Sequence, residues 1–315
     1  MLSRIAESLF WIGRYVERAD DTARILDAYI ARLLEDPWAD EDRGGRAILS
    51  ILGAAPPADT QHARVTTSVV LDVLAFDATS PSAIAGALTA ARDNARGARE
   101  TISSEMWECL NVTWHALPAR RLAADRLGPA MYLQFVRERA AVLAGLAEST
   151  MSRDDGWRFL ILGRSLERVD MTARMISVQT DAAPDHPAWR TVLRACGADE
   201  SFLRTHGGTV RADRVAEFLL LDRLFPRSAL HALTTAEQCL LELDPAVDRA
   251  GVTDAARRPI GQVRTRLEYT ESDSLLGDLG AHLERLKDAC AAASAAVTER
   301  YFPESAPVTW AHEEV

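Results

Sequence analysis

The residues best suited to chemistry are arginines and carboxylates that occur at the same spacing twice, 150 positions apart. A guanidinium holds its donors in a fixed fork that matches a carboxylate or phosphate group. In a helix, steps of three and four residues place such side chains on one flank. The two sets are Arg14, Glu17, Arg18, Asp20 and Arg24, and then Arg164, Glu167, Arg168, Asp170 and Arg174.

Two interpretations of these doubled stripes remain open, and they can coexist. In the first, the charges form ion pairs within the protein and determine how two parts of the chain dock, since buried pairs specify geometry more than they stabilise. In the second, Glu17 and Glu167 orient an arginine cluster that binds carboxylate or phosphate groups. The arginines of that cluster are Arg14, Arg18, Arg164 and Arg168.

Further candidates are weaker. Arg99 and Glu105 stand near Trp107 in another charged stretch and are included as possible ligand contacts. Glu17 or Glu167 could also serve as the general base of an enzyme that modifies peptides. That alternative requires a carboxylate that is open to a cavity, so whether the chain is an enzyme stays undecided.

Other reaction centres find little support in the sequence. A di-iron or di-manganese helical bundle needs Glu-x-x-His pairs, and none of the seven histidines follows a glutamate by three residues. No G-x-S-x-G nucleophile motif, Walker-type loop or G-x-G-x-x-G fingerprint occurs. We therefore expect no metal, no cofactor and no nucleotide site of the chain's own.

The first stripe borders a seam of apolar residues spaced alternately by three and four, from Leu2 to Leu33. This spacing predicts one long helix over residues 3–34, packed lengthwise against other helices. Gly13 and Gly163 occupy matching positions beside the two seams. Glycine inside a helix costs about 1 kcal/mol relative to alanine. We expect it there because the two helices approach each other closely.

The repetition extends beyond composition. Residues 13–24 and 163–174 share eight identities in twelve positions, most of them polar. We predict an all-α fold, with a single helical bundle domain over 1–315 built from two duplicated, pseudo-symmetric halves. The halves would span about 1–152 and 153–303, followed by a loosely attached tail at 304–315.

Proline, glycine and capping residues suggest the other element boundaries. Short helices are predicted at 46–53 and 66–76, and a long one from Ser80-Pro81 to about Asn111. We expect a break at Pro118 and a new helix opening at Gly128-Pro129.

Charge and cysteine usage limit the class of protein. The net charge of −10 argues against general nucleic-acid binding, which needs a basic surface. The four cysteines are widely separated, as free thiols of a cytoplasmic protein would be. No apolar run approaches the length of a membrane span, and the amphipathic start does not resemble a signal peptide. We expect a cytoplasmic protein without membrane or nucleic-acid partners.

Four separated stretches resemble the bacterial Alpha-E family, and together they cover essentially the whole chain. They are residues 6–20, 99–108, 156–157 with 162–168, and 218–222 with 225–228. The region after Pro245 carries the least distinctive motif. The resemblance implies no catalytic residue, because no mechanism is established for the family.

The resemblance does imply partners. Such proteins are typically encoded beside, or fused to, a circularly permuted ATP-grasp ligase, often with a transglutaminase-like protein. Our leading hypothesis is therefore a helical accessory protein of an ATP-grasp amidoligase system that forms peptide or amide bonds. It would bind a peptide or amino-acid substrate, or the ligase itself, through the Arg/Glu/Asp stripes. The alternatives are an enzyme in its own right and a purely structural interaction module.

Overall fold

The computed structural model describes residues 2–36, 38–56, 64–177, 186–245 and 251–303, and these contain helices and no strand. The expected all-α class is therefore confirmed. The helices are α1 (Ser3–Glu35), α2 (Glu41–Ile51), α3 (Thr67–Leu71), the π-helix η2 (Asp72–Phe76), α4 (Ile84–Gly97), α5 (Ser104–Leu127), α6 (Ala130–Thr150), α7 (Asp155–Ser177), α8 (Ala188–Ala195), α9 (Asp199–His206), α10 (Ala212–Leu221), α11 (Ala229–Leu243), α12 (Arg257–Glu268), α13 (Ser272–Gly277) and α14 (Leu279–Tyr301).

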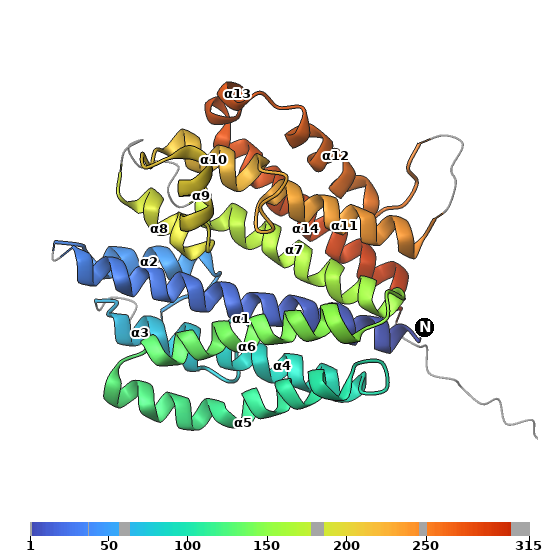
Figure 1. Ribbon diagram of the computed structural model, residues 1–315, viewed down its shortest axis with the longest axis horizontal. Coiled ribbons are helices and arrows are strands. Elements are labelled where there is room, and N and C mark those ends of the chain that lie inside the picture. The colour runs from blue at the N-terminus through green and yellow to red at the C-terminus, as the bar shows by residue number, and fades with distance from the viewer. Residues whose placement is uncertain (1, 37, 57–63, 178–185, 246–250, 304–315) are drawn as a thin grey trace, which may run out of the picture.

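The two helices that carry the stripes, α1 and α7, lie side by side through the centre of the molecule. Figure 1 shows α4, α5 and α6 on one side of this pair and α11, α12 and α14 on the other. The α1 seam is buried at Leu9, Ile12, Ala19 and Leu26, as its spacing predicts. The stripes thus stand at the contact between the two groups of helices.

Glycine allows α1 and α7 to touch backbone to backbone. A Cβ atom added to Gly13 would overlap the carbonyl oxygen of Leu160 and lie 2.9 Å from the amide nitrogen of Arg164. A Cβ atom on Gly163 would overlap the carbonyl oxygen of Phe10. The predicted close approach of the two helices is therefore confirmed, and it explains a glycine inside each.

Contacts around this crossing are reciprocal. Arg18 of α1 donates to the carbonyl oxygen of Pro81 at 3.3 Å, and Arg168 of α7 donates to that of Pro226 at 3.0 Å. Such reciprocity is compatible with two related halves, although the duplication itself stays a prediction. The tail expected at 304–315 lies outside the described residues.

The helix expected over 80–111 is wrong, because two helices replace it. Helix α4 begins at Ile84, after a turn at Pro81, and ends at Gly97. Helix α5 begins anew at Ser104, where the Ser103 hydroxyl accepts a hydrogen bond from the amide of Met106 at 3.2 Å. The uninterrupted helical periodicity of this stretch concealed the serine cap that starts the second helix.

The expected break at Pro118 is also wrong, since α5 continues through it to Leu127. Pro118 is exposed, so water can hydrate the carbonyl group that loses its helical donor. The helix predicted at 46–53 starts too late, because α2 spans Glu41–Ile51. Asp40 caps this helix, which begins at Glu41, by accepting from the amide of Arg43 at 3.1 Å.

The apolar interior forms two clusters around the central pair. One cluster joins the first half of α1 to α7, α11 and α14, and another joins the second half of α1 to α2–α6. Of the helices in the described part of the chain, none is both long and apolar enough to cross a membrane.

Candidate functional site

The glutamates of the two stripes pair across the α1–α7 contact rather than along their own helices. The Glu167 carboxylate of α7 accepts from Arg14 Nε at 2.7 Å, and from Arg18 Nε at 2.6 Å and Nη2 at 3.1 Å. Glu167 is only 1% exposed. Two guanidinium groups of α1 therefore enclose one carboxylate of α7.

The opposite pair is built in the same way. Glu17 of α1 accepts from Arg168 of α7 at 2.6 Å and 2.9 Å, and Arg227 lies 3.3 Å away. Because each helix supplies the carboxylate for the other's arginines, the pairs determine both register and spacing of α1 against α7. We call these residues, Arg14, Glu17, Arg18, Glu167 and Arg168, the central lattice.

Arg227 completes the lattice on one side only. Its guanidinium binds Asp20 and, at 2.6 Å, Asp21. The residue 145 positions before Arg227 is Ser82, and the residue 150 positions after Asp21 is Met171. The contact between Arg227 and Asp21 therefore has no counterpart on the other side of the helix pair. Sequence reasoning assigned no role to Arg227, although the stretch at 225–228 was distinctive enough to signal it.

Charge neutralisation determines how the lattice carboxylates titrate. Burial alone would raise the pKa of Glu17, but Arg168 and Arg227 lower it to about 2. Burial also acts to raise the pKa of Glu167, but Arg14 and Arg18 outweigh it and the pKa is lowered. Both carboxylates therefore stay ionised throughout the ordinary pH range.

Asp21 behaves in the opposite way. Burial is the main cause, and with the charges of Glu17 and Asp20 it outweighs Arg227 and raises the pKa of Asp21 to about 8. One of its carboxylate oxygens, Oδ2, is buried without a hydrogen-bond partner among the described residues. A neutral carboxyl group is the form that such surroundings favour.

The other predicted site residues lie further out. Arg24 binds Asp20 at 3.0 Å and Arg174 binds Asp170 at 2.7 Å, each along its own helix. Arg164 does not bind the lattice carboxylates; it reaches Glu148 at 3.5 Å. Burial, and then the charge of Arg168, lowers its pKa.

Arg99 and Glu105 are separate from the lattice. Arg99 lies in the turn before α5 with its guanidinium 5.1 Å from the centre of the Trp107 ring, and Glu105 is exposed in the first turn of α5. The structure therefore does not bring them to the stripes, because the chain turns away between α4 and α5.

A groove of about 550 Å³ borders the lattice where α14 passes α1 and α7. Arg14 and Arg174 bring positive charge to it and Asp170 brings negative charge. Arg14 is held there because its Nη1 donates to Ser294 Oγ of α14 at 2.9 Å. The α14 side contributes Lys287, Cys290, Ala291, Ser294, Ala295, Thr298 and Glu299.

This arrangement argues against Glu17 or Glu167 as a general base. A base must reach a substrate proton and works best with a pKa near the working pH. Both carboxylates are sealed by arginines that lower their pKa values, and neither lines the groove. Within the described ranges, no three histidine, cysteine or acidic side chains gather as metal ligands would.

Mycobacterial proteins are similar in sequence to this chain. The chain is 24% identical over 298 residues to uncharacterised proteins of Mycobacterium bovis and Mycobacterium tuberculosis. Each match covers 86% of this chain and 33% of the relative, so the chain spans about a third of the length of these curated relatives. No solved structure matches it.

A family described as a predicted alpha-helical domain with a conserved ER motif matches residues 1–302. Two Glu-Arg dipeptides, Glu17-Arg18 and Glu167-Arg168, stand at the centre of the α1–α7 contact. The chain therefore belongs to the Alpha-E family.

Proposed function

We propose that this protein is a helical accessory component of an ATP-grasp amide-forming system, and that it holds an amino-acid or peptide substrate in the groove between α1, α7 and α14. The observation that carries the proposal is the pairing of opposite charges in that groove. Arg14 brings a guanidinium group suited to a carboxylate, and Arg174 and Asp170, which pair with each other at 2.7 Å, bring one charge of each sign.

The central lattice supports this role as a rigid frame. Arg14 is fixed by Glu167 on one side and by Ser294 on the other, so its guanidinium is already oriented before a ligand arrives. A preorganised site binds more tightly because less side-chain freedom is lost on binding.

A second support concerns the ligase. The sequence has no phosphate-binding loop of its own, so the ATP chemistry would belong to the partner. The mycobacterial relatives are about three times as long as the matched region, which leaves room in one chain for further components. The ligase and a transglutaminase-like protein are the partners that the family resemblance implies.

Calorimetry with the dipeptide Ala-Ala tests the substrate site. We expect wild-type protein to bind the free dipeptide and not the acetylated, amidated form, which lacks both charges. The double substitution Arg174→Gln with Lys287→Gln should weaken binding about tenfold. The pair Arg96→Gln with Arg126→Gln, on exposed parts of α4 and α5, removes the same charge and should leave it unchanged.

The ligase partnership is tested separately by co-purification and by turnover of the ATP-grasp enzyme with and without this protein. We expect a complex, and turnover that rises when the protein is added. No complex together with unchanged turnover would remove the partnership, whatever the dipeptide result.

A further inference from the structure

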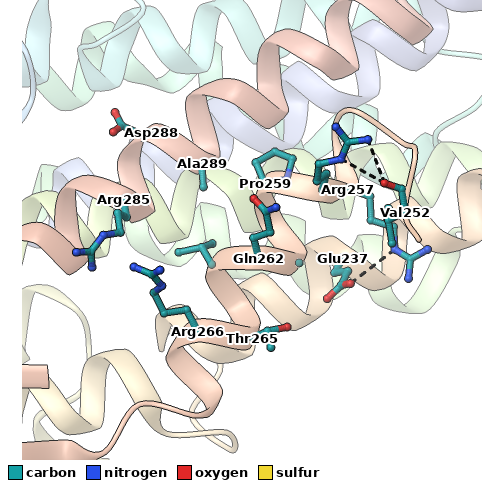
Figure 2. Close-up of a pocket in the computed structure, with 13 residues that line it drawn as sticks. Glu237, Val252, Arg257, Pro259, Gln262, Thr265, Arg266, Arg285, Asp288 and Ala289 are labelled. Carbon is teal, nitrogen blue, oxygen red and sulfur yellow. Dashed lines mark hydrogen bonds and ion pairs between the residues drawn. The ribbon is translucent and has the colours of Figure 1, made fainter. Parts of the chain in front are cut away.

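A second groove lies on the other face of α14, between α12, α11 and α14, and arginines outnumber acidic residues in its lining (Figure 2). Its volume is about 1100 Å³. Helix α12 carries four arginines and one acidic residue, on a chain whose net charge is −10. The arginines that line the groove are Arg257, Arg258, Arg266 and Arg285.

Only one of these charges is neutralised inside the groove. Glu237 of α11 lies 3.6 Å from Arg257 and 2.5 Å from Arg264, so its charge is fully engaged. Arg258 donates to the carbonyl oxygen of Val252 at 3.2 Å, which holds its guanidinium without cancelling its charge. The end of the groove that holds Arg257 and Arg258 thus keeps an excess of positive charge.

At the opposite end Arg266 adds a further positive charge, whereas the charge of Arg285 is offset by Asp278, which lies outside the lining. Figure 2 shows both side chains extending from α12 and α14 at the same end of the groove. Arg285 donates through Nη2 to Asp278 at 2.9 Å. Arg266 is exposed and makes no side-chain hydrogen bond or ion pair with any residue that the structure describes. Asp288 is the other acidic residue of the lining, and among the described residues it forms no ion pair with Arg266 or Arg285.

His282 is buried in α14 beside this end of the groove. Burial lowers the pKa of His282, the positive charges of Arg285 and Arg266 lower it further, and the negative charge of Asp278 raises it. Asp278 offsets one of the two guanidinium charges, so one positive charge at this end is left for an anion to neutralise.

We propose that this groove binds a small organic polyanion with at least two phosphate or carboxylate groups. Arg266 and Arg285 would bind one group and Arg258 another, with the Gln262 amide as a neutral donor. A groove of about 1100 Å³ has room for a molecule of nucleotide size. The site is independent of the substrate groove, because Ala289 and Asp288 face one and Cys290 and Lys287 the other.

Calorimetry at constant ionic strength tests the proposal, with tripolyphosphate and citrate as the probes and magnesium absent. We expect tripolyphosphate to bind the wild-type chain, and Arg266→Gln with Arg285→Gln to weaken binding about tenfold or more. Both residues are at least partly exposed, so a melting curve should show the double variant folded. Equal binding of citrate would assign the site to both anion classes, and tripolyphosphate alone would assign it to phosphates.

Two matched controls keep the test specific. Arg126→Gln with Arg204→Gln removes the same charge from exposed positions of α5 and α9 and should change affinity less than about twofold. Arg174→Gln with Lys287→Gln, in the other groove, should also leave tripolyphosphate binding unchanged. The proposal is overturned if neither probe binds the wild-type chain, or if any control weakens binding as much as the α12–α14 variant.

Discussion

Glu167 sits between two arginines of α1, and Glu17 sits between Arg168 of α7 and Arg227 of the segment that joins α10 to α11. For Glu17 and Glu167, the attraction of two guanidinium groups exceeds the penalty of burial, and both remain ionised. Such a pair adds little net stability compared with apolar side chains, yet removing one partner leaves a buried charge uncompensated. The lattice therefore selects one alignment of α1 and α7.

Glu167→Gln is expected to lower the free energy of unfolding by about 3 kcal/mol, because Arg14 and Arg18 would keep their charges without a carboxylate. Urea unfolding followed by circular dichroism measures this. Glu35→Gln, which removes an exposed partner of Arg194, is the control and should cost less than about 1 kcal/mol. Equal effects of the two substitutions would contradict a buried lattice.

Asp21 gives the protein a pH dependence of opposite sign. Its folded pKa of about 8 exceeds the unfolded value of about 4, so between these pH values the folded state holds a proton that the unfolded state lacks. Stability from this group is complete below pH 4 and decreases as pH rises towards 8. We expect the unfolding free energy of Asp21→Asn to fall less between pH 5 and 8 than that of the wild type.

Urea unfolding at several pH values measures the difference. Glu17 does not interfere in this window, because its lowered pKa makes its contribution disappear only below about pH 4.5. Parallel pH profiles for Asp21→Asn and the wild type would show that Asp21 is ionised throughout.

Among the elements, α1 and α7 depend on backbone contact as much as on charge. Any side chain at Gly13 or Gly163 meets a carbonyl oxygen of the facing helix, which cannot move aside as a flexible side chain could. The helices would have to separate, and the lattice pairs, at 2.6–3.1 Å, would lengthen with them. Glycine and the lattice thus act on the same spacing.

Gly13→Ala should therefore lower the free energy of unfolding by about 2–3 kcal/mol, although alanine is the better helix former. Gly145→Ala in α6 is the matched control, since a Cβ atom there meets nothing within 4 Å. That substitution should raise stability by about 0.5–1 kcal/mol. Thermal and urea unfolding of both variants decide; stabilisation by Gly13→Ala would refute the close contact.

For the whole molecule, the consequence is that neither side of the α1–α7 contact is complete alone. A fragment of residues 1–152 would expose the α1 seam and leave Glu17 without Arg168. A fragment of 153–303 would leave Glu167 without Arg14 and Arg18. Unpaired charges and bare apolar seams at the same surface disfavour folding of either fragment.

We expect neither fragment to unfold cooperatively by itself, and a mixture of the two to regain helicity and a single melting transition. The division falls at the short connection between α6 and α7, so no helix is cut. Circular dichroism and size-exclusion chromatography provide the measurement. A fragment that melts cooperatively alone would show that the fold consists of separable domains.

The sequence by itself determined the helical class, the position of α1 and the close approach at Gly13 and Gly163. These follow from short-range regularities: an apolar seam with helical spacing, and a residue type whose cost in a helix needs a reason. Local patterns were less informative about boundaries, because the cap at Ser103 and an exposed Pro118 act through only one or two hydrogen bonds each.

Only the tertiary structure decided which charges meet. Residue spacing placed Arg14 beside Glu17 on one helix, but the chain brings Arg14 to Glu167 and Glu17 to Arg168. Arg227 joins Asp20 and Asp21 from more than 200 positions away. Long, flexible side chains can pair with several carboxylates of equal chemistry, and the choice among them depends on how whole helices pack, which no local sequence pattern encodes.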